Sequence, residues 1–151
     1  MRDAWKGIFV VKGILHPQDA EEALRVGADG LIVSNHGGRQ LATAAAPFAV
    51  LPTVVDAVGS RLAVMVDGGV RRGSDIVRAV LAGACFVFAG RPTLYGAAAG
   101  GEPGAARALT ILLDEFDRTM ALLGCRTFDE LRANVDVKSR ERARLISAAT
   151  Q

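Results

Sequence analysis

The chain has few of the residues and segments that mark several large classes of protein. Only two of its 151 residues are cysteine, so the sequence implies neither a disulfide framework nor a cysteine metal site. No apolar run approaches the ~18 residues that a membrane-spanning helix needs, and the first residues lack the apolar core of a signal peptide. We therefore expect a cytoplasmic protein without a membrane segment.

The chain also lacks an excess of charge of one sign. Its formal net charge is +2, and lysine and arginine form no long block, which argues against nucleic acid as a partner. The composition is 50% hydrophobic and 23% charged, as is typical of a folded chain. A length of 151 residues suits one domain, so we expect residues 1–151 to form a single unit.

Short apolar runs alternate with helical patterns along the chain. Strands are predicted at 8–11, 30–33, 62–66 and 85–88, and helices at 17–26, 47–58, 75–81 and 105–123. Ser74 is expected to cap the third helix, and Thr127 and Glu130 have the spacing of a capping box for a short last helix. The alternation predicts an α/β fold with a parallel sheet buried on both faces. The stripe of the long helix is expected to be core: Leu109, Leu112, Leu113, Phe116, Met120 and Leu123.

Two architectures share this pattern. A doubly wound sheet often carries Gly-x-Gly-x-x-Gly after a strand, and that motif is missing here. A (β/α)8 TIM barrel places polar chemistry after each strand and binds phosphate after its last two strands. The chain has this second distribution, because polar residues or glycines follow every predicted strand: Lys12; His36 and Arg39; Asp67, Gly68, Gly69 and Arg71; Gly90 and Arg91.

Four βα units make only half of a barrel, which needs roughly 200 residues or more. We therefore predict a half barrel that corresponds to strands five to eight. Half a barrel has two open strand edges and an uncovered inner face, and open edges favour pairing. The chain is thus expected to form a homo-oligomer or to pair with a complementary half-barrel chain, unless it is only marginally stable. A compact open sheet of four strands is the alternative.

The segment Ser34-Asn35-His36-Gly37-Gly38-Arg39-Gln40 directly follows a predicted strand. Histidine titrates near neutral pH, so His36 is suited to take and return a proton. The planar fork of Arg39 fits a carboxylate with two hydrogen bonds. Together they suggest a site for an acid that bears a removable proton. From the residues alone, Lys12 fits a solvated strand end as well as it fits such a site.

These motifs resemble the C-terminal half of the FMN-dependent 2-hydroxy acid oxidases and dehydrogenases, the group of glycolate oxidase, lactate oxidase and mandelate dehydrogenase. The resemblance covers about residues 10–131. It rests on four segments in order: Val11-Lys12-Gly13-Ile14; Ser34-Asn35-His36-Gly37-Gly38-Arg39-Gln40-Leu41; Val66-Asp67-Gly68-Gly69-Val70-Arg71-Arg72-Gly73; and Gly90-Arg91-Pro92 followed by Tyr95-Gly96.

The resemblance implies FMN as cofactor and a small (S)-2-hydroxy acid as substrate, oxidised to the 2-oxo acid. His36 would be the base, and Arg39 would hold the substrate carboxylate beside it. Lys12 would lie near N1 and the C2 carbonyl of the flavin, and Ser34 would bond the flavin. The remaining cofactor contacts would be Asp67 with the ribityl hydroxyls, and Gly68, Gly69, Val70, Arg71, Gly90 and Arg91 with the phosphate.

The chain departs from the family pattern in two ways. Ala42 stands where the family usually has an aspartate after Gln-Leu. The N-terminal half of the family, with its substrate tyrosines and the carboxylate that orients the histidine, has no counterpart in these residues. Three hypotheses follow: an enzyme that needs a complementary half, a non-catalytic FMN- or phosphate-binding half barrel, and a truncated remnant without a ligand.

Four other residues receive structural expectations. Cys85 and Cys125 are expected to be inert core thiols, and His16 to lie on the surface before a helix. Tyr95 is expected to pack rather than to bind. No residue set suggests a metal site.

Overall fold

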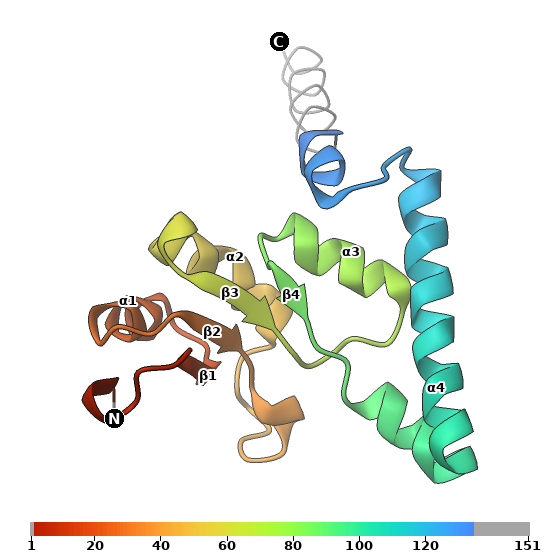
Figure 1. Cartoon of the computed structure of the whole chain (residues 1–151), viewed down its shortest axis with the longest axis horizontal. Coiled ribbons are helices and arrows are strands. Elements are labelled where there is room, and N and C mark those ends of the chain that lie inside the picture. The colour runs from red at the N-terminus through yellow and green to blue at the C-terminus, as the bar shows by residue number, and fades with distance from the viewer. Residues whose placement is uncertain (1, 135–151) are drawn as a thin grey trace.

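The computed structural model describes residues 2–134, which hold one four-stranded parallel sheet. The strands lie in chain order, each followed by a helix (Figure 1). This confirms the α/β fold with a parallel sheet. The elements are β1 (Val10–Ile14), α1 (Pro17–Arg25), β2 (Gly30–Val33), α2 (Pro47–Val58), β3 (Ala63–Val66), α3 (Gly73–Leu81), β4 (Phe86–Val87) and α4 (Arg91–Leu122).

Strand β1 departs from its predicted bounds in a way that matters for the site. It begins at Val10 and continues through Lys12 to Ile14, instead of covering 8–11. Its pairing with β2 is irregular between Lys12 and Ile14, where Gly13 adopts a φ of 99°. Irregularities of this kind redirect side chains near strand ends. Lys12 is therefore part of the strand and not of the loop after it.

The prediction that Ser74 caps α3 is wrong. The helix begins two residues before the predicted start at Asp75, at Gly73, and Ser74 lies inside its first turn. The carboxylate of Asp75 instead accepts the backbone N–H groups of Arg71 and Arg72, both at 3.0 Å. A carboxylate satisfies these donors well and favours the positive end of the helix.

Helix α4 is longer than the predicted 105–123, because it begins at Arg91. Gly100 and Gly101 depart from helical geometry and divide it. The capping box predicted for the last helical segment, 128–134, is confirmed in part. Thr127 Oγ1 accepts the Glu130 N–H at 3.1 Å as predicted, whereas Glu130 accepts the Arg126 N–H at 2.6 Å and not that of Thr127.

The sheet has one packed face and one open face, so the expected burial of both faces is wrong within residues 2–134. Leu31 and Val33 of β2 are fully buried against α1 and α2, together with Val66 of β3. The alternate residues face the other way and are less covered. Ile32 and Met65 are half-buried there, and Phe86 is 56% exposed. The inner face therefore lacks a packing partner among the described residues.

A smaller second core joins α3 and α4 to segment 128–134. It contains Val77, Met120, Cys125 and Leu131. The long-helix stripe is only partly core, because Leu112 and Met120 are buried whereas Leu109 and Leu113 are exposed. The α3 helix is too short to cover the full length of α4.

The expectation of two core thiols is half wrong. Cys125 is buried, whereas Cys85 is exposed at the start of β4, the last strand of the sheet. Within residues 2–134, no helix is both long enough and apolar enough to span a bilayer.

Candidate functional site

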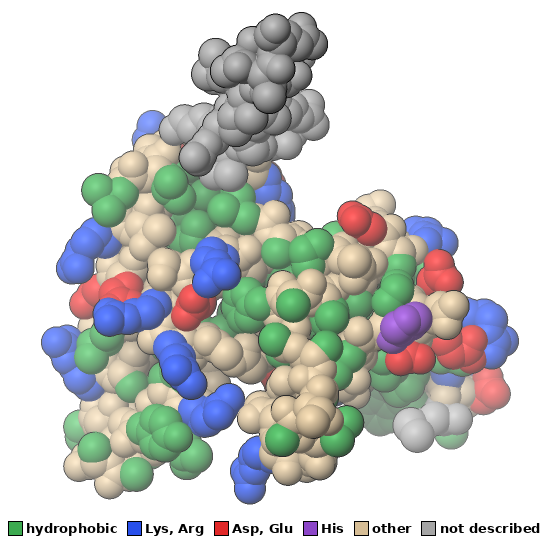
Figure 2. Space-filling model, turned by 180° about the vertical axis from the view of Figure 1, so that it is seen from behind, with side chains coloured by type: hydrophobic (Ala, Val, Ile, Leu, Met, Phe, Trp, Pro, Cys, Tyr) green, Lys and Arg blue, Asp and Glu red, His purple; other side chains and the backbone are tan. Residues whose placement is uncertain are grey.

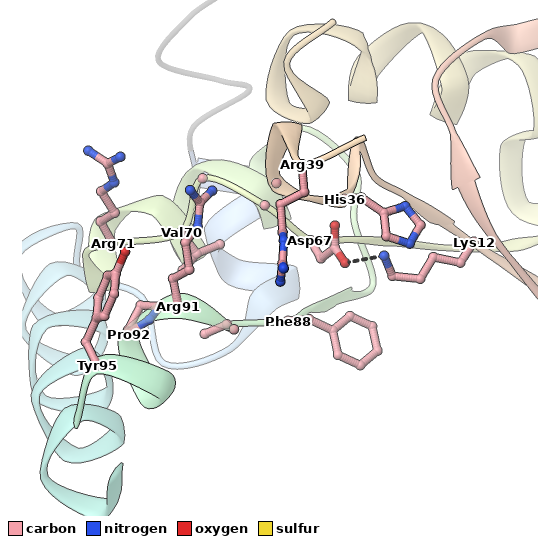
Figure 3. Close-up of a pocket in the computed structure, with 15 residues that line it drawn as sticks. Lys12, His36, Arg39, Asp67, Val70, Arg71, Phe88, Arg91, Pro92 and Tyr95 are labelled. Atoms are coloured by element: carbon pink, nitrogen blue, oxygen red, sulfur yellow. Dashed lines mark ion pairs between the residues drawn. The ribbon is translucent and has the colours of Figure 1, made fainter. Parts of the chain in front are cut away.

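The loops after β2, β3 and β4 meet at one edge of the sheet and, with Lys12 of β1 and the start of α4, line a pocket of about 650 Å³ (Figure 3). They meet there because the carboxyl ends of parallel strands share one edge. Every predicted site residue except Ser34 lines this pocket: Lys12, His36, Arg39, Asp67, Gly68, Gly69, Val70, Arg71, Gly90 and Arg91. The size is typical of a small-molecule site.

Lys12 lines one end of the pocket, where it contacts Asp67 and the buried Ser34. Its Nζ lies 2.8 Å from Asp67 Oδ2 and donates to Ser34 Oγ at 2.8 Å. Ser34 is only 1% exposed, so it supports Lys12 from below and does not line the pocket. Lys12 therefore lines the pocket and is paired with Asp67, although its side chain is still 39% exposed.

Asp67 carries an unsatisfied oxygen. Oδ2 is paired with Lys12, whereas Oδ1 is buried and has no hydrogen-bond partner among residues 2–134. A buried carboxylate oxygen without a partner is costly, and such atoms are rare in folded proteins. A hydroxyl-bearing ligand in the pocket would satisfy it.

His36 lies in an uncommon backbone conformation. Its φ of 56° makes it the one non-glycine residue with a left-handed φ in the described part of the chain. The side chains of the two preceding residues hold it there: Ser34 Oγ accepts the His36 N–H at 3.1 Å, and Asn35 Oδ1 accepts the Gly37 N–H at 2.9 Å. Such conformations cluster at functional sites. The exposed imidazole has no hydrogen bond to any residue within 2–134.

Three arginines surround the pocket. Figure 3 shows the Arg39 guanidinium extending into it from the His36 loop, with Arg71 at the end far from Lys12. Arg91 reaches the His36 loop from the start of α4, since a Cβ on Gly37 would lie 3.2 Å from Arg91 Nη2. With Lys12 included, four fixed cations face the single carboxylate of Asp67 among the lining residues. The pocket is thus suited to an anion.

The loop after β3 lines this pocket with residues whose backbone donors are free among the described residues. Gly68 and Gly69 have φ values of 83° and 82°, which L side chains rarely adopt. The N–H groups of Gly68, Gly69 and Val70 donate to no protein acceptor among residues 2–134. Gly90 has open space where a Cβ would be. Adjacent free N–H groups beside arginines form a cradle that suits phosphate.

Sequence reasoning missed several lining residues. Phe88 and Ala89 line the pocket and lie between β4 and Gly90. Their position directly after a strand is the sequence feature that could have marked them as lining residues. Tyr95 also lines the pocket and is 67% exposed, so the expectation that it packs is wrong. It follows Arg91 by four residues on α4, hence on the same helix face. No cluster suited to a metal ion occurs within residues 2–134.

Comparisons with known proteins identify the family. Residues 1–137 match the FMN-dependent dehydrogenase family. The chain belongs to this family. It is 45% identical to an L-lactate dehydrogenase of Caulobacter sp. (strain K31), over 92% of this chain and 37% of that protein. It is 50% identical to a peroxisomal (S)-2-hydroxyacid oxidase of Arabidopsis thaliana, over 83% of this chain and 35% of that protein.

A solved structure agrees with the family assignment. Mandelate oxidase with (S)-4-hydroxymandelic acid superposes with a TM-score of 0.83 at 40% identity, over 87% of this chain and 37% of that one. The chain therefore spans little more than a third of the length of these relatives.

FMN is the cofactor of the family, and the pocket of this member fits it on three observations. The unsatisfied Oδ1 of Asp67 matches a ligand with hydroxyl groups. The free N–H groups at Gly68 to Val70, with Arg91 opposite, match a phosphate. The Lys12 ammonium lies at the other end, where a ring that gains negative charge would meet a fixed cation.

Proposed function

We propose that the chain forms the catalytic-base and phosphate-binding side of an FMN-dependent enzyme that oxidises a small (S)-2-hydroxy acid to the 2-oxo acid. The observation that carries this proposal is a single pocket with two chemically different ends. One end holds His36 and Arg39 near the Lys12 ammonium. The other end holds Arg71 and the loop of Gly68 to Val70, whose N–H groups have no protein acceptor among residues 2–134, and the Arg91 guanidinium reaches from α4 to Gly37 of the His36 loop.

His36 and Arg39 account for the substrate side. Arg39 binds the carboxylate of the acid with its planar fork and so orients C2 and its hydroxyl. His36 then accepts the proton of that hydroxyl as the carbonyl forms. When bound, FMN supplies the acceptor for the hydride equivalent that leaves C2.

The cofactor side uses the remaining residues. Lys12 would stabilise negative charge on the bound flavin, and the buried Ser34 holds Lys12 in place from outside the pocket, so the flavin contact expected of Ser34 is not supported. Asp67 Oδ1 accepts a ribityl hydroxyl. The phosphate is held by the backbone and side chains of two loops: Gly68, Gly69, Val70 and Arg71 after β3, and Gly90 and Arg91 after β4.

We further propose that these four strands are strands five to eight of a TIM barrel, and that residues 1–151 act as one half-barrel unit. The exposed inner face supports this. Phe86 and Phe88 lie on that face with their ring centroids 4.9 Å apart, and they are 56% and 39% exposed. The edge strands β1 and β4 would pair with a complementary half or with a second copy of the chain. A cytoplasmic location stays a prediction.

A second candidate is a half barrel that binds FMN or phosphate without catalysis. It is favoured by one observation: the His36 imidazole has no orienting carboxylate among residues 2–134. An unoriented base loses much of its rate advantage. In this case the cradle would bind the cofactor, and no substrate would be oxidised. The truncated remnant, the third hypothesis from the sequence, would bind no ligand at all.

Anaerobic spectroscopy separates these functions. The purified chain is loaded with FMN, alone or with the N-terminal half of a family member, and then mixed with lactate, glycolate or mandelate. Bleaching of the flavin absorbance by one of these acids supports the enzyme. Bound FMN that none of them reduces, even with the added half, supports the binding module. No bound FMN would contradict both and leave the remnant.

A further inference from the structure

The end of the β3–α3 loop is held by two carboxylates. Asp75, within α3, accepts the N–H groups of Arg71 and Arg72. The next N–H, that of Gly73, donates to Glu115 Oε2 at 2.9 Å. Three consecutive backbone donors are thus used outside the pocket, whereas those of Gly68 to Val70 have no protein acceptor within residues 2–134.

Glu115 comes from α4, a separate helix that is distant in sequence. Its other oxygen, Oε1, accepts from Arg72 Nη1 at 2.7 Å. The Gly73 N–H and the Arg72 guanidinium, in that order, hold the pKa of the Glu115 carboxyl below its usual range. The carboxylate is therefore charged at neutral pH, and it engages both the backbone and the side chain at the end of the loop.

Gly73 makes this contact possible. A Cβ on Gly73 would lie 2.1 Å from the backbone nitrogen of Phe116, a distance that only glycine avoids. The first turn of α3 therefore lies directly on the backbone of α4. At the other end of the loop, the Asp67 N–H donates to Val33 O at 3.1 Å in the sheet. The loop of 67–73 is anchored at both ends, by the sheet and by α4.

We propose that Glu115 is a positioning residue for the phosphate cradle. By holding Gly73 and Arg72, it fixes the loop so that the Gly68, Gly69 and Val70 N–H groups face the pocket. It also keeps the Arg72 guanidinium against α4. The inference rests on the proposed phosphate site and adds a residue that does not line the pocket.

A rival explanation is purely electrostatic and predicts the opposite effect of Glu115 on FMN affinity. A carboxylate behind a phosphate site repels the phosphate, so its charge alone would weaken binding. Two variants separate position from charge. Glu115→Asp keeps the charge but shortens the side chain, which withdraws the acceptor from Gly73. Glu115→Gln removes the charge but keeps an oxygen acceptor at the same reach.

The experiment titrates the full chain with FMN and with riboflavin, followed by quenching of flavin fluorescence. Riboflavin lacks the phosphate, so it reports general damage to the pocket. E115D is expected to lose roughly ten-fold in FMN affinity, the effect of one hydrogen bond to a charged group, with riboflavin affinity unchanged. E115Q is expected to keep most of its FMN affinity. Asp117→Asn, an exposed carboxylate on the same helix, serves as the charge control.

Each remaining outcome counts against the proposal. Tighter FMN binding by E115Q, with E115D like wild type, would show that only charge matters. Equal losses for FMN and riboflavin would show a general structural role. Unchanged FMN binding by E115D would remove Glu115 from the account while leaving the phosphate site intact. A wild-type chain that does not prefer FMN over riboflavin would instead overturn the proposed phosphate site itself.

Discussion

The two sides of the sheet differ in how completely the described residues cover them. On the helix side, Leu31 and Val66 are fully buried, and the loop of 67–73 that follows β3 is held by Asp75 and Glu115. On the inner side, Phe86 is 56% exposed, and the His36 imidazole has no hydrogen bond within residues 2–134. The groups proposed to bind phosphate are thus held in place within the described residues, whereas the proposed base has no orienting partner among them.

The space-filling view shows the charge that accompanies this division. Figure 2 shows several Lys and Arg side chains gathered around a hollow, with only a few acidic side chains among them. Among the residues that line the pocket, Lys12, Arg39, Arg71 and Arg91 are cationic and Asp67 is the one carboxylate. An anionic cofactor and an anionic substrate both gain from such a field.

The largest expected effect comes from removing the proposed base on the inner side. His36→Ala should slow flavin reduction by a 2-hydroxy acid by about 10²–10⁴-fold, the usual contribution of general-base catalysis, and should leave FMN bound. The measurement is anaerobic stopped-flow absorbance of FMN-loaded protein, with a complementary half added. His16→Ala is the matched control, because His16 only caps α1 through Gln18. A rate in H36A equal to that in H16A would exclude His36 as the base.

Much of the fold could be predicted, because its signals are local. Strand β2 and helix α2 have the predicted bounds, since Gly30, Pro47 and Gly59 mark their ends in the sequence. The site could be located because residues after parallel strands meet at one edge. Glu115 could not be found in this way: its partners, Arg72 and Gly73, are brought to it only by the packing of α3 on α4. The exposure of Tyr95 and Cys85 likewise depends on what covers α4 and β4.

The next largest effect is on stability. It compares the loss of unfolding free energy when a side chain is truncated on either face of β2. Leu31→Ala should lower the free energy of unfolding by about 2–5 kcal/mol, because Leu31 is fully buried. Ile32→Ala, on the half-buried inner face, should cost less than about 1.5 kcal/mol in dilute protein. Urea unfolding at two protein concentrations measures both. If a second copy covers the inner face, the Ile32→Ala cost should grow with concentration. Equal costs for both variants at every concentration would contradict an open face.

A smaller effect concerns the phosphate end. Arg91→Ala should weaken FMN binding by about 1.5–3 kcal/mol, the range for a hydrogen bond to a charged group. Riboflavin binding should change little. Arg107→Ala removes the same charge from an exposed position on α4 and is the control. Isothermal titration of both flavins gives the comparison. Equal FMN affinity in the two variants would remove Arg91 from the phosphate site.

The smallest effect is on the loss of protein stability at low pH, to which the Glu115 contact contributes. Because the folded-state pKa of Glu115 is lowered, its contribution to stability is present above the unfolded pKa of about 4.3 and is lost as the pH falls below it. Glu115→Gln should therefore lose less stability than wild type between neutral pH and about pH 3.5. Urea unfolding at the two pH values measures this. An identical acid loss in both proteins would mean that the carboxylate is not stabilised in the folded state.

The most direct test of the central claim is an amide NMR titration of the ¹⁵N-labelled chain with FMN and with riboflavin. The account predicts that FMN shifts the amide signals of Gly68, Gly69, Val70, Gly90 and Arg91, and that riboflavin leaves these signals in place. Shifts confined to other residues, or the same shifts with riboflavin, would contradict a phosphate site at the ends of β3 and β4.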